Sequence, residues 1–336
     1  YRDGMFVLGD PDKADTEEVF ALRPMTCPFQ FQVYLNRQRS YRDLPMRLSE
    51  TSTLFRNESS GEMHGLIRLR QFTISEAHIA CTPEQLEGEF AQCVELATFM
   101  LKTLGLDDDV SYRFSKWDEN NKEKYIGSAE QWEEVQGRMR QILNDLNIKY
   151  TEADGEAAFY GPKLDIQIRN VHGKEDTLVT VQIDFQLAER FGMTYIDENG
   201  QKQYPYVVHR TSIGCYERTL ALLIEKYAGA MPTWLAPVQV KVLSITDRVD
   251  PFCKELIQRL KDAGVRVEYD NRNEKIGYKI REAQLEKVPY MLVIGDKEME
   301  NKTVAVRSRK AGDMGVKGVD EFLSMLLYEI HTKQNN

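Results

Sequence analysis

Four side chains suited to binding a charged ligand recur at even spacing in residues 65–78. Arg68, Phe72, Glu76 and His78 supply a cation, an aromatic ring, a carboxylate and an imidazole. If this segment is a β-strand, residues at even spacing project from the same face. The residues between them are mostly apolar or small, as expected for a strand side that packs on a core. The polar side should therefore line a binding site.

A partner strand for this segment lies directly upstream. Residues 44–58 are followed by the polar, glycine-bounded stretch 59–65, which predicts an antiparallel hairpin. Arg56 and Glu58 are two positions apart, so they would project from the same face of the first strand. Alternating charges on a hairpin usually mark a solvated face. The aromatic ring and the imidazole among the charges argue for a site instead.

The composition indicates a globular protein of two ordinary domains. The chain has 336 residues, of which 42% are hydrophobic and 29% are charged. No run approaches the roughly 18 apolar residues of a membrane helix, and no signal peptide is visible, so we expect no membrane contact. Five scattered cysteines without a CxxC pair favour a reducing compartment, and we expect the cytoplasm. The first residue is tyrosine, which suggests a trimmed fragment.

The charge distribution restricts the kind of nucleic-acid contact that is plausible. The net charge of −9 argues against a non-specific nucleic-acid binder. Residues 271–310, however, hold ten Lys and Arg against six Asp and Glu. A locally basic stretch on an acidic protein suits contact with a few defined phosphates or bases.

A domain boundary is expected near residues 231–237, where two prolines flank a tryptophan between a helical and a strand-like segment. Downstream, strands alternate with helices, such as residues 251–264 with Asp250 as the expected N-cap, which indicates a small α/β domain. Upstream, several strands are expected together with helices that do not alternate with them, which suggests an α+β domain.

Three further groups of residues could bind a ligand or take part in catalysis. Gln182 and Asp184 share the polar side of an otherwise buried strand, where they could serve a ligand or an internal polar layer. The turn at residues 160–163 could project Tyr160 and Lys163. Arg218 lies near a predicted helix start, a position that favours anions, although pairing with Glu217 or Glu225 is the more common role for a single arginine.

Cys27, His78 and His209 are candidate metal ligands by residue type. They are far apart in the sequence, and their spacing follows no metal-binding pattern. The residues alone therefore stop short of predicting a metal site.

Several short motifs together resemble those of a known enzyme family. FRNE with RLRQF, GPK with VQIDF, and GCYER before a helix resemble motifs 2 and 3 of class II aminoacyl-tRNA synthetases. MTCP, EAHI, VVHR and PTWLAPVQV are similar to the threonine-specific members of that class. The resemblance covers essentially the whole chain.

This resemblance implies an α+β catalytic domain built on an antiparallel sheet in residues 1–236, truncated after motif 1, followed by a small α/β anticodon-binding domain in residues 237–336. The implied activity is that of an aminoacyl-tRNA ligase, which activates L-threonine with ATP and transfers it to tRNA(Thr). Zn²⁺, Mg²⁺ with ATP, and a homodimer are also implied.

The resemblance assigns roles to individual residues. It implies zinc ligands at Cys27, His78 and His209. Catalytic arginines near the α- and γ-phosphates of ATP would be Arg56 and Arg218, and the remaining ATP contacts would be Glu58, Arg68, Phe72 and Gln182. The residues implied to contact the amino acid are Glu76, Tyr160 and Lys163, and those implied to read the anticodon are Asn273, Glu298 and Arg307.

The chain departs from the family pattern beside the site, with Ile74, Ser75 and Glu76 in place of Gln, Asp and Asp, and with Cys215 in place of a smaller residue. Amino-acid selectivity could differ as a result. Two alternatives remain open. A sister enzyme for proline or glycine should lack the Cys, His, His set, and a non-catalytic paralogue that binds tRNA should lack Arg56 or Arg218.

Overall fold

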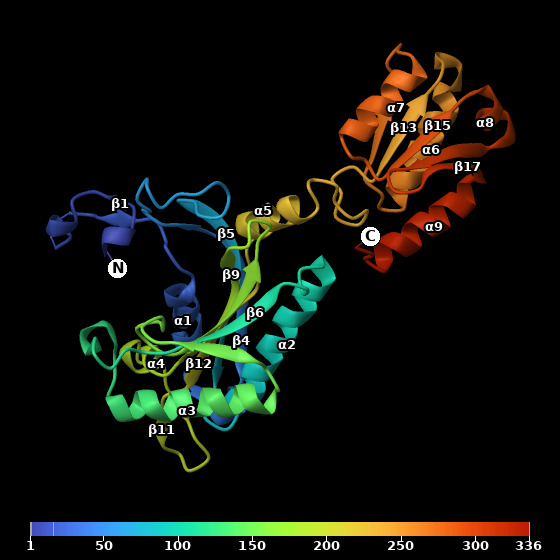
Figure 1. Cartoon of the computed structure of the whole chain (residues 1–336). Coiled ribbons are helices and arrows are strands. Elements are labelled where there is room, and N and C mark those ends of the chain that lie inside the picture. The colour runs from blue at the N-terminus through green and yellow to red at the C-terminus, as the bar shows by residue number, and fades with distance from the viewer. Residues whose placement is uncertain (1, 16, 336) are drawn as a thin grey trace. The chain divides into compact units, whose positions relative to one another are not determined.

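The computed structural model describes residues 2–15 and 17–335 and divides into two compact units, residues 1–222 and 223–336 (Figure 1). The division falls within helix α5 (Tyr216–Lys226), upstream of the boundary expected after residue 236. Residues 231–236 belong to the second unit, where hydrogen bonds hold them. Arg309 donates to the carbonyl of Met231 at 2.7 Å, and Arg266 donates to that of Trp234 at 2.7 Å.

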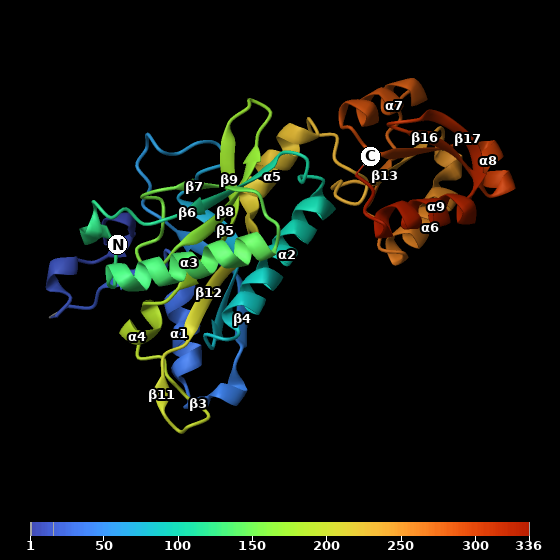
Figure 2. The ribbon, with the colours of Figure 1, turned by 60° about the horizontal axis from the view of Figure 1, so that its bottom comes forward.

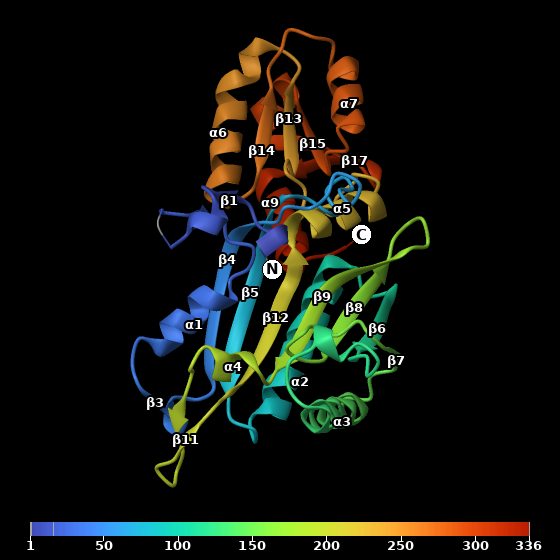
Figure 3. The same ribbon diagram turned by 90° about the vertical axis from the view of Figure 1, so that its left-hand side faces the viewer.

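The first unit is built on one large, mostly antiparallel sheet, which confirms the expected α+β class (Figure 3). All neighbouring strands are antiparallel except the last pair, which is parallel. In spatial order the strands are β4 (Met46–Phe55), β5 (Gln71–Cys81), β12 (Tyr206–Cys215), β9 (Glu175–Asp184), β8 (Lys163–Arg169), β6 (Val110–Ser115) and β7 (Tyr150–Ala153).

Helices α2 (Leu86–Leu104) and α3 (Ala129–Asp145) cover one face of this sheet (Figure 2). Ser128 and Gln131 form the capping box that the sequence predicts at the start of α3. The core under these helices combines their apolar side chains with inward residues of the strands, among them Phe90, Met139, Ile79, Val181, Ile183 and Val208.

The opposite face of the sheet is left for polar side chains because residues alternate along each strand. Ile79 and Val208 point to the helices, so His78 and His209 point away from them. Helix α1 (Cys27–Leu35) covers one end of this second face, where Phe31 packs near both histidine rings. The two faces therefore separate a hydrophobic core from a site.

The antiparallel hairpin of β4 and β5 is confirmed, with pairs running from Met46–Ala80 to Phe55–Gln71. The prediction that Arg68 lies on the strand is wrong, because β5 begins at Gln71 and residues 56–70 form the connection. Gly65 has φ +48°, and a single bridge joins His64 to Arg68. This polar segment turns back on itself rather than extending the ladder.

Smaller elements complete the first unit. The remaining elements are strands β1 (Val7–Leu8), β2 (Phe20–Ala21), β3 (Arg39–Ser40), β10 (Tyr195–Ile196) and β11 (Lys202–Gln203), helix α4 (Leu187–Arg190), and 3-10 helices η1 (Arg2–Gly4), η2 (Pro11–Lys13), η3 (Tyr41–Asp43) and η4 (Lys122–Lys124). Strands β1 and β2 pair with each other, and β10 pairs with both β3 and β11.

The second unit is an α/β domain with a mixed sheet. In spatial order its strands are β14 (Val267–Asp270), β13 (Val240–Ser244), β15 (Tyr290–Ile294), β16 (Thr303–Ser308) and β17 (Gly312–Gly318). The first three are parallel, and β16 and β17 add to β15 in antiparallel order.

Its helices lie on both faces of that sheet. Helices α6 (Asp250–Asp262) and α9 (Val319–His331) pack on one face, and α7 (Ile276–Leu285) packs on the other. The short helices α8 (Asp296–Asn301) and η5 (Asp247–Val249) complete the unit. Asp250 is not the expected N-cap of α6, because it is already helical and its carboxylate accepts the hydroxyl proton of Tyr269.

A close backbone contact at Gly161 gives a test of this fold. A Cβ atom there would lie 1.7 Å from the carbonyl oxygen of Ile183 on β9, so Gly161→Ala must push the turn that leads into β8 away from β9. We expect it to lower the free energy of unfolding by roughly 3 kcal/mol. Gly137→Ala in α3 is the control, since its Cβ would meet no described atom within 4 Å beyond its neighbours and its own helix backbone. It should raise the free energy of unfolding by about 0.5–1 kcal/mol. Urea unfolding that ranks Gly161→Ala as the more stable variant would contradict the β8–β9 geometry.

Candidate active site and metal centre

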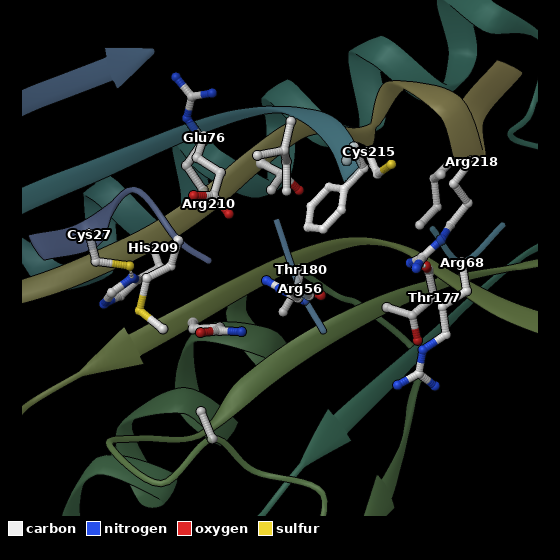
Figure 4. Close-up of a pocket in the computed structure, with 18 of the residues that line it drawn as sticks. Cys27, Arg56, Arg68, Glu76, Thr177, Thr180, His209, Arg210, Cys215 and Arg218 are labelled. Atoms are coloured by element: carbon white, nitrogen blue, oxygen red, sulfur yellow. Dashed lines mark hydrogen bonds between the residues drawn. The ribbon is translucent and has the colours of Figure 1, made fainter. Parts of the chain in front are cut away.

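A cavity of about 530 Å³ opens on the polar face of the large sheet. It is walled by β5, β9, β12 and the connection between β4 and β5. Figure 4 shows Cys27 and His209 at one end and Arg68 and Arg218 at the other. The cavity brings together eleven of the residues that the sequence marked, namely Cys27, Arg56, Glu58, Arg68, Phe72, Glu76, His78, Tyr160, Gln182, His209 and Arg218.

The three candidate metal ligands meet at one end of the cavity. His78 and His209 are direct partners in the β5–β12 ladder, and their ring centroids lie 4.5 Å apart. Cys27 joins them from the start of α1, with its Sγ 3.6 Å from Nδ1 of His209. One donor atom from each residue lies within 4.8 Å of the other two.

This geometry fits a metal ion that prefers sulfur and nitrogen ligands. Tetrahedral zinc places a thiolate sulfur and an imidazole nitrogen roughly 3.6 Å apart, which is the separation between Cys27 and His209. Both histidines are buried. Three protein ligands leave a coordination position open to a ligand in the cavity.

The two imidazoles have opposite electrostatic surroundings. Burial, with the neighbouring His209 and Arg210, holds the pKa of His78 well below its usual value. Burial also lowers the pKa of His209, but the charge of Cys27 and the hydrogen bonds to Asp184 and Cys27 outweigh it and raise this pKa to about 10. Negative charge thus concentrates beside His209, where a cation would be stabilised.

Glu76 and Tyr160 lie beside the candidate metal ligands. The carboxylate of Glu76 accepts a hydrogen bond from the hydroxyl of Thr26, which is fully buried. The ring of Tyr160 stacks on His209 at 5.0 Å, and its hydroxyl donates to Gln182. Burial and the nearby charges of Cys27, Asp184 and Glu76 hold the pKa of Tyr160 well above its usual value.

Lys163 is the one expected catalytic-domain residue that does not line the cavity. Its ammonium group lies 3.0 Å from the buried carboxylate of Asp165 on the same strand. It is the ladder partner of Gln182, whose side chain does line the cavity.

Three arginines also line the cavity, with Arg68 and Arg218 at the end away from Cys27 and His209 (Figure 4). The guanidinium of Arg56 lies 5.0 Å from the ring centroid of Phe72, and Arg68 pairs with Glu58 at 2.8 Å. Arg218, in the first turn of α5, donates to two backbone carbonyls, at 3.0 Å and 2.8 Å.

The thiol of Cys215 also lines the cavity at this end. It donates to the carboxylate of Glu217 at 3.1 Å, and burial raises its pKa. The same carboxylate accepts the backbone N–H of Thr73 on β5. Cys215 therefore belongs to the junction that joins β12 and α5 to β5.

Sequence reasoning missed two residues of the site, Gln30 and Thr26. Gln30 follows Cys27 by one helical turn, so the spacing alone places both on one side of α1. Its side-chain oxygen lies 2.8 Å from Nδ1 of His78. Asp184, which the sequence left between a ligand role and an internal polar layer, contacts Nε2 of His209 at 3.0 Å.

The three residues expected to read an anticodon lie in the second unit. Asn273 is exposed after β14, and Glu298 in α8 accepts the N–H of Gly295 at 2.9 Å. Both follow parallel strands and so lie at the same edge of the sheet. Arg307 pairs with Asp313 at 3.1 Å and sits opposite Met291, near the beginning of β15.

The sequence also matches known families. The tRNA synthetase class II core domain (G, H, P, S and T) matches residues 11–227, and the anticodon binding domain matches residues 239–329. The chain belongs to the class II tRNA synthetases. Its catalytic core and its anticodon-binding domain correspond to the α+β and α/β units of the structure.

Curated relatives within the class II tRNA synthetases are close in sequence. The chain is 64% identical over 335 residues to a protein of Clostridium perfringens (strain SM101 / Type A) named threonine--tRNA ligase. It is 65% identical over 334 residues to a protein of the same name from Clostridium botulinum (strain Eklund 17B / Type B). All or nearly all of this chain is aligned, but it spans about half of these relatives, 52% of each.

Solved class II structures share the fold. The RNA binding domain of threonyl-tRNA synthetase from Cryptosporidium parvum Iowa II matches with a TM-score of 0.90 and 32% identity, over 98% of this chain and 80% of that one. A prolyl-tRNA synthetase from Cryptosporidium parvum matches with a TM-score of 0.70 and 21% identity, over 100% and 62%, which supports the fold alone. Among the described residues, no helix is both long and apolar enough to cross a membrane.

Proposed function

We propose that this chain activates L-threonine with ATP to form threonyl-adenylate and transfers threonine to the 3′ end of tRNA(Thr). The observation that carries the proposal is one cavity with a Cys/His/His donor set at one end and arginines at the other. The close relatives named threonine--tRNA ligase support it.

The phosphate end suits adenylate formation. The threonine carboxylate is already ionised at neutral pH, attacks the α-phosphorus of ATP and displaces pyrophosphate, so the step needs positive charge rather than a strong base. Arg56 and Arg218 would supply that charge, together with Mg²⁺ that accompanies ATP. Phe72 offers a flat apolar surface for adenine, which Glu58 would hydrogen-bond.

Two further residues complete the proposed ATP site. Arg68 would contact the phosphates from the connection between β4 and β5, and Gln182 would face the ribose or the adenylate. Both line the cavity. Their positions on separate elements would hold the nucleotide from two sides, which favours in-line attack.

The metal end suits threonine. Cys27, His78 and His209 would hold Zn²⁺, which when bound acts as a Lewis acid for the amino and hydroxyl groups of the amino acid. Valine has no hydroxyl and would leave a position unfilled. Glu76 would accept a hydrogen bond from the threonine hydroxyl, and Tyr160 and Lys163 would complete the amino-acid site.

The second unit would bind the anticodon of tRNA(Thr) through Asn273, Glu298 and Arg307. The family match to an anticodon binding domain and the local excess of basic residues support this role. A homodimer and a cytoplasmic location remain predictions.

Two alternatives are less well supported. A class II enzyme for proline or glycine would have no use for a Cys/His/His donor set, whereas these three side chains converge here. A non-catalytic paralogue that only binds tRNA would not need Arg56 and Arg218, yet both line the cavity.

Replacing Arg218 tests the phosphate site. Arg218→Ala should lower threonine-dependent ATP–pyrophosphate exchange by about 100-fold or more, because a lost charge contact in the transition state costs roughly 3–4 kcal/mol. Arg140→Ala is a matched control, since Arg140 on α3 pairs with Glu152 and does not line the cavity. Near-normal exchange in Arg218→Ala would remove Arg218 from the ATP site.

Replacing Glu76 tests selectivity. Serine carries the same amino and hydroxyl groups as threonine and lacks only a methyl group, a difference worth roughly 1–3 kcal/mol, so it should be activated at a detectable rate. Glu76→Asp shortens the side chain that Thr26 holds and should change the threonine-to-serine ratio of kcat/KM. Steady-state activation of both amino acids measures this ratio. An unchanged ratio would exclude Glu76 from the amino-acid site.

Replacing Arg307 tests the anticodon role. Arg307→Ala should lower kcat/KM for charging tRNA(Thr) by about 10-fold, in line with the loss of roughly 1–3 kcal/mol per base contact, and should leave pyrophosphate exchange unchanged. Lys254→Ala on the exposed side of α6 serves as the control for a lost surface charge. Equal charging by the wild type and Arg307→Ala would count against this assignment.

A further inference from the structure

The two histidines of the metal centre are each held by a buried acceptor, but through different ring nitrogens. Nδ1 of His78 lies 2.8 Å from Oε1 of Gln30, a residue that is 4% exposed. Nε2 of His209 lies 3.0 Å from Oδ2 of Asp184, which is fully buried. This leaves Nε2 of His78 and Nδ1 of His209 for the metal, and the latter lies 3.6 Å from Sγ of Cys27.

A histidine that binds a metal is neutral and carries one N–H and one lone pair, and only the nitrogen with the lone pair can bind the metal. A carboxylate can only accept a hydrogen bond, so Asp184 holds the proton of His209 on Nε2. The amide oxygen of Gln30, oriented as in the structure, holds the proton of His78 on Nδ1. Each contact therefore directs a lone pair toward the donor cluster.

We propose that Gln30 and Asp184 are positioning residues that fix opposite tautomers of the two metal ligands, so that His78 binds through Nε2 and His209 through Nδ1. This inference rests on the proposed metal site and deepens it. The two contacts also differ in charge. Zn²⁺, the Cys27 thiolate and the Asp184 carboxylate sum to zero formal charge, so the neutral amide of Gln30 orients His78 without adding a negative charge.

Asp184 offers a nearly isosteric test. Its Oδ1 accepts the backbone N–H groups of Gln186 and Leu187, both at 2.9 Å. In Asp184→Asn the remaining oxygen should keep those bonds and turn the amide N–H₂ toward His209. A donor there forces the lone pair onto Nε2 and the proton onto Nδ1, which removes His209 as a ligand.

Gln30 offers a paired test on the other histidine. Gln30→Met keeps the length of the side chain but has no strong acceptor, whereas Gln30→Glu keeps an acceptor oxygen. Gln136→Met is the control for losing a buried amide elsewhere, because Gln136 is 2% exposed and its amide bonds to Trp117 and Glu133.

The experiment measures zinc affinity of the whole chain by competition with a chromophoric chelator, together with the absorption spectrum of the Co²⁺-loaded protein. Asp184→Asn and Gln30→Met should bind zinc about 10- to 100-fold more weakly than the wild type and change the Co²⁺ spectrum. Gln30→Glu should stay close to the wild type, and Gln136→Met should match it. Circular dichroism confirms that each variant is folded.

Nitrogen NMR of the zinc-loaded wild type gives a readout that needs no variant. The expected pattern is protonated Nδ1 with metal-bound Nε2 for His78, and the reverse for His209. The proposal would be overturned by wild-type zinc affinity in both Asp184→Asn and Gln30→Met, or by an equal loss of affinity in Gln136→Met. It would also be overturned by the same tautomer in both histidines, or by a wild type that binds no zinc. Threonine-dependent pyrophosphate exchange is measured in parallel, so a protein that binds zinc as expected but makes no adenylate would reject the proposed function alone.

Discussion

The antiparallel pairing of β5 with β12 is the constraint on which the site depends. Its register sets His78 directly opposite His209, although the two residues are 131 positions apart in the chain. Because side chains alternate along a strand, a shift of either strand by one residue would turn its imidazole into the core under α2 and α3 and separate it from the other. The hydrophobic residues Ile79 and Val208, which pack under those helices, resist such a shift. The core thus fixes the register, and the register places the two candidate metal ligands opposite each other.

The proposed phosphate end depends on a second local constraint, where β12 passes into α5. The ladder between β12 and β5 is irregular between Thr211 and Cys215, and Gly214 adopts φ +73°. A Cβ atom at Gly214 would lie 2.0 Å from the carbonyl oxygen of Leu178 on β9, so only glycine fits without movement. This bend begins α5 beside the cavity and places Arg218 in its first turn. The strand therefore carries a candidate metal ligand near one end, and an arginine follows just beyond the other.

Local sequence patterns predicted the helices and strands of this structure better than they predicted the contacts between them. The hairpin of β4 and β5 follows from alternation and a polar connection, yet that connection proved longer than expected because residues 56–70 form their own turn, which contains Arg68. The convergence of Cys27 with the two histidines depends on long-range strand pairing and on the docking of α1, which no spacing in the sequence encodes. The resemblance to a family supplied those residues, whereas Gln30 emerged only from the folded geometry.

The two ends of the cavity differ in how they are prepared for a ligand. The histidines are buried and held by buried acceptors, so little reorganisation is needed for a metal to bind there. At the other end, Arg68 pairs with Glu58 while its side chain is 47% exposed, and ion pairs of this kind contribute at most about 1 kcal/mol. A triphosphate can displace that pair at small cost. The polar contacts of Arg218 with backbone carbonyls satisfy its charge only in part, since a carbonyl carries no net charge. The proposed amino-acid end is therefore held in place by internal hydrogen bonds, whereas the proposed nucleotide end keeps its cations in contacts that a charged ligand could exchange without disturbing the candidate metal ligands.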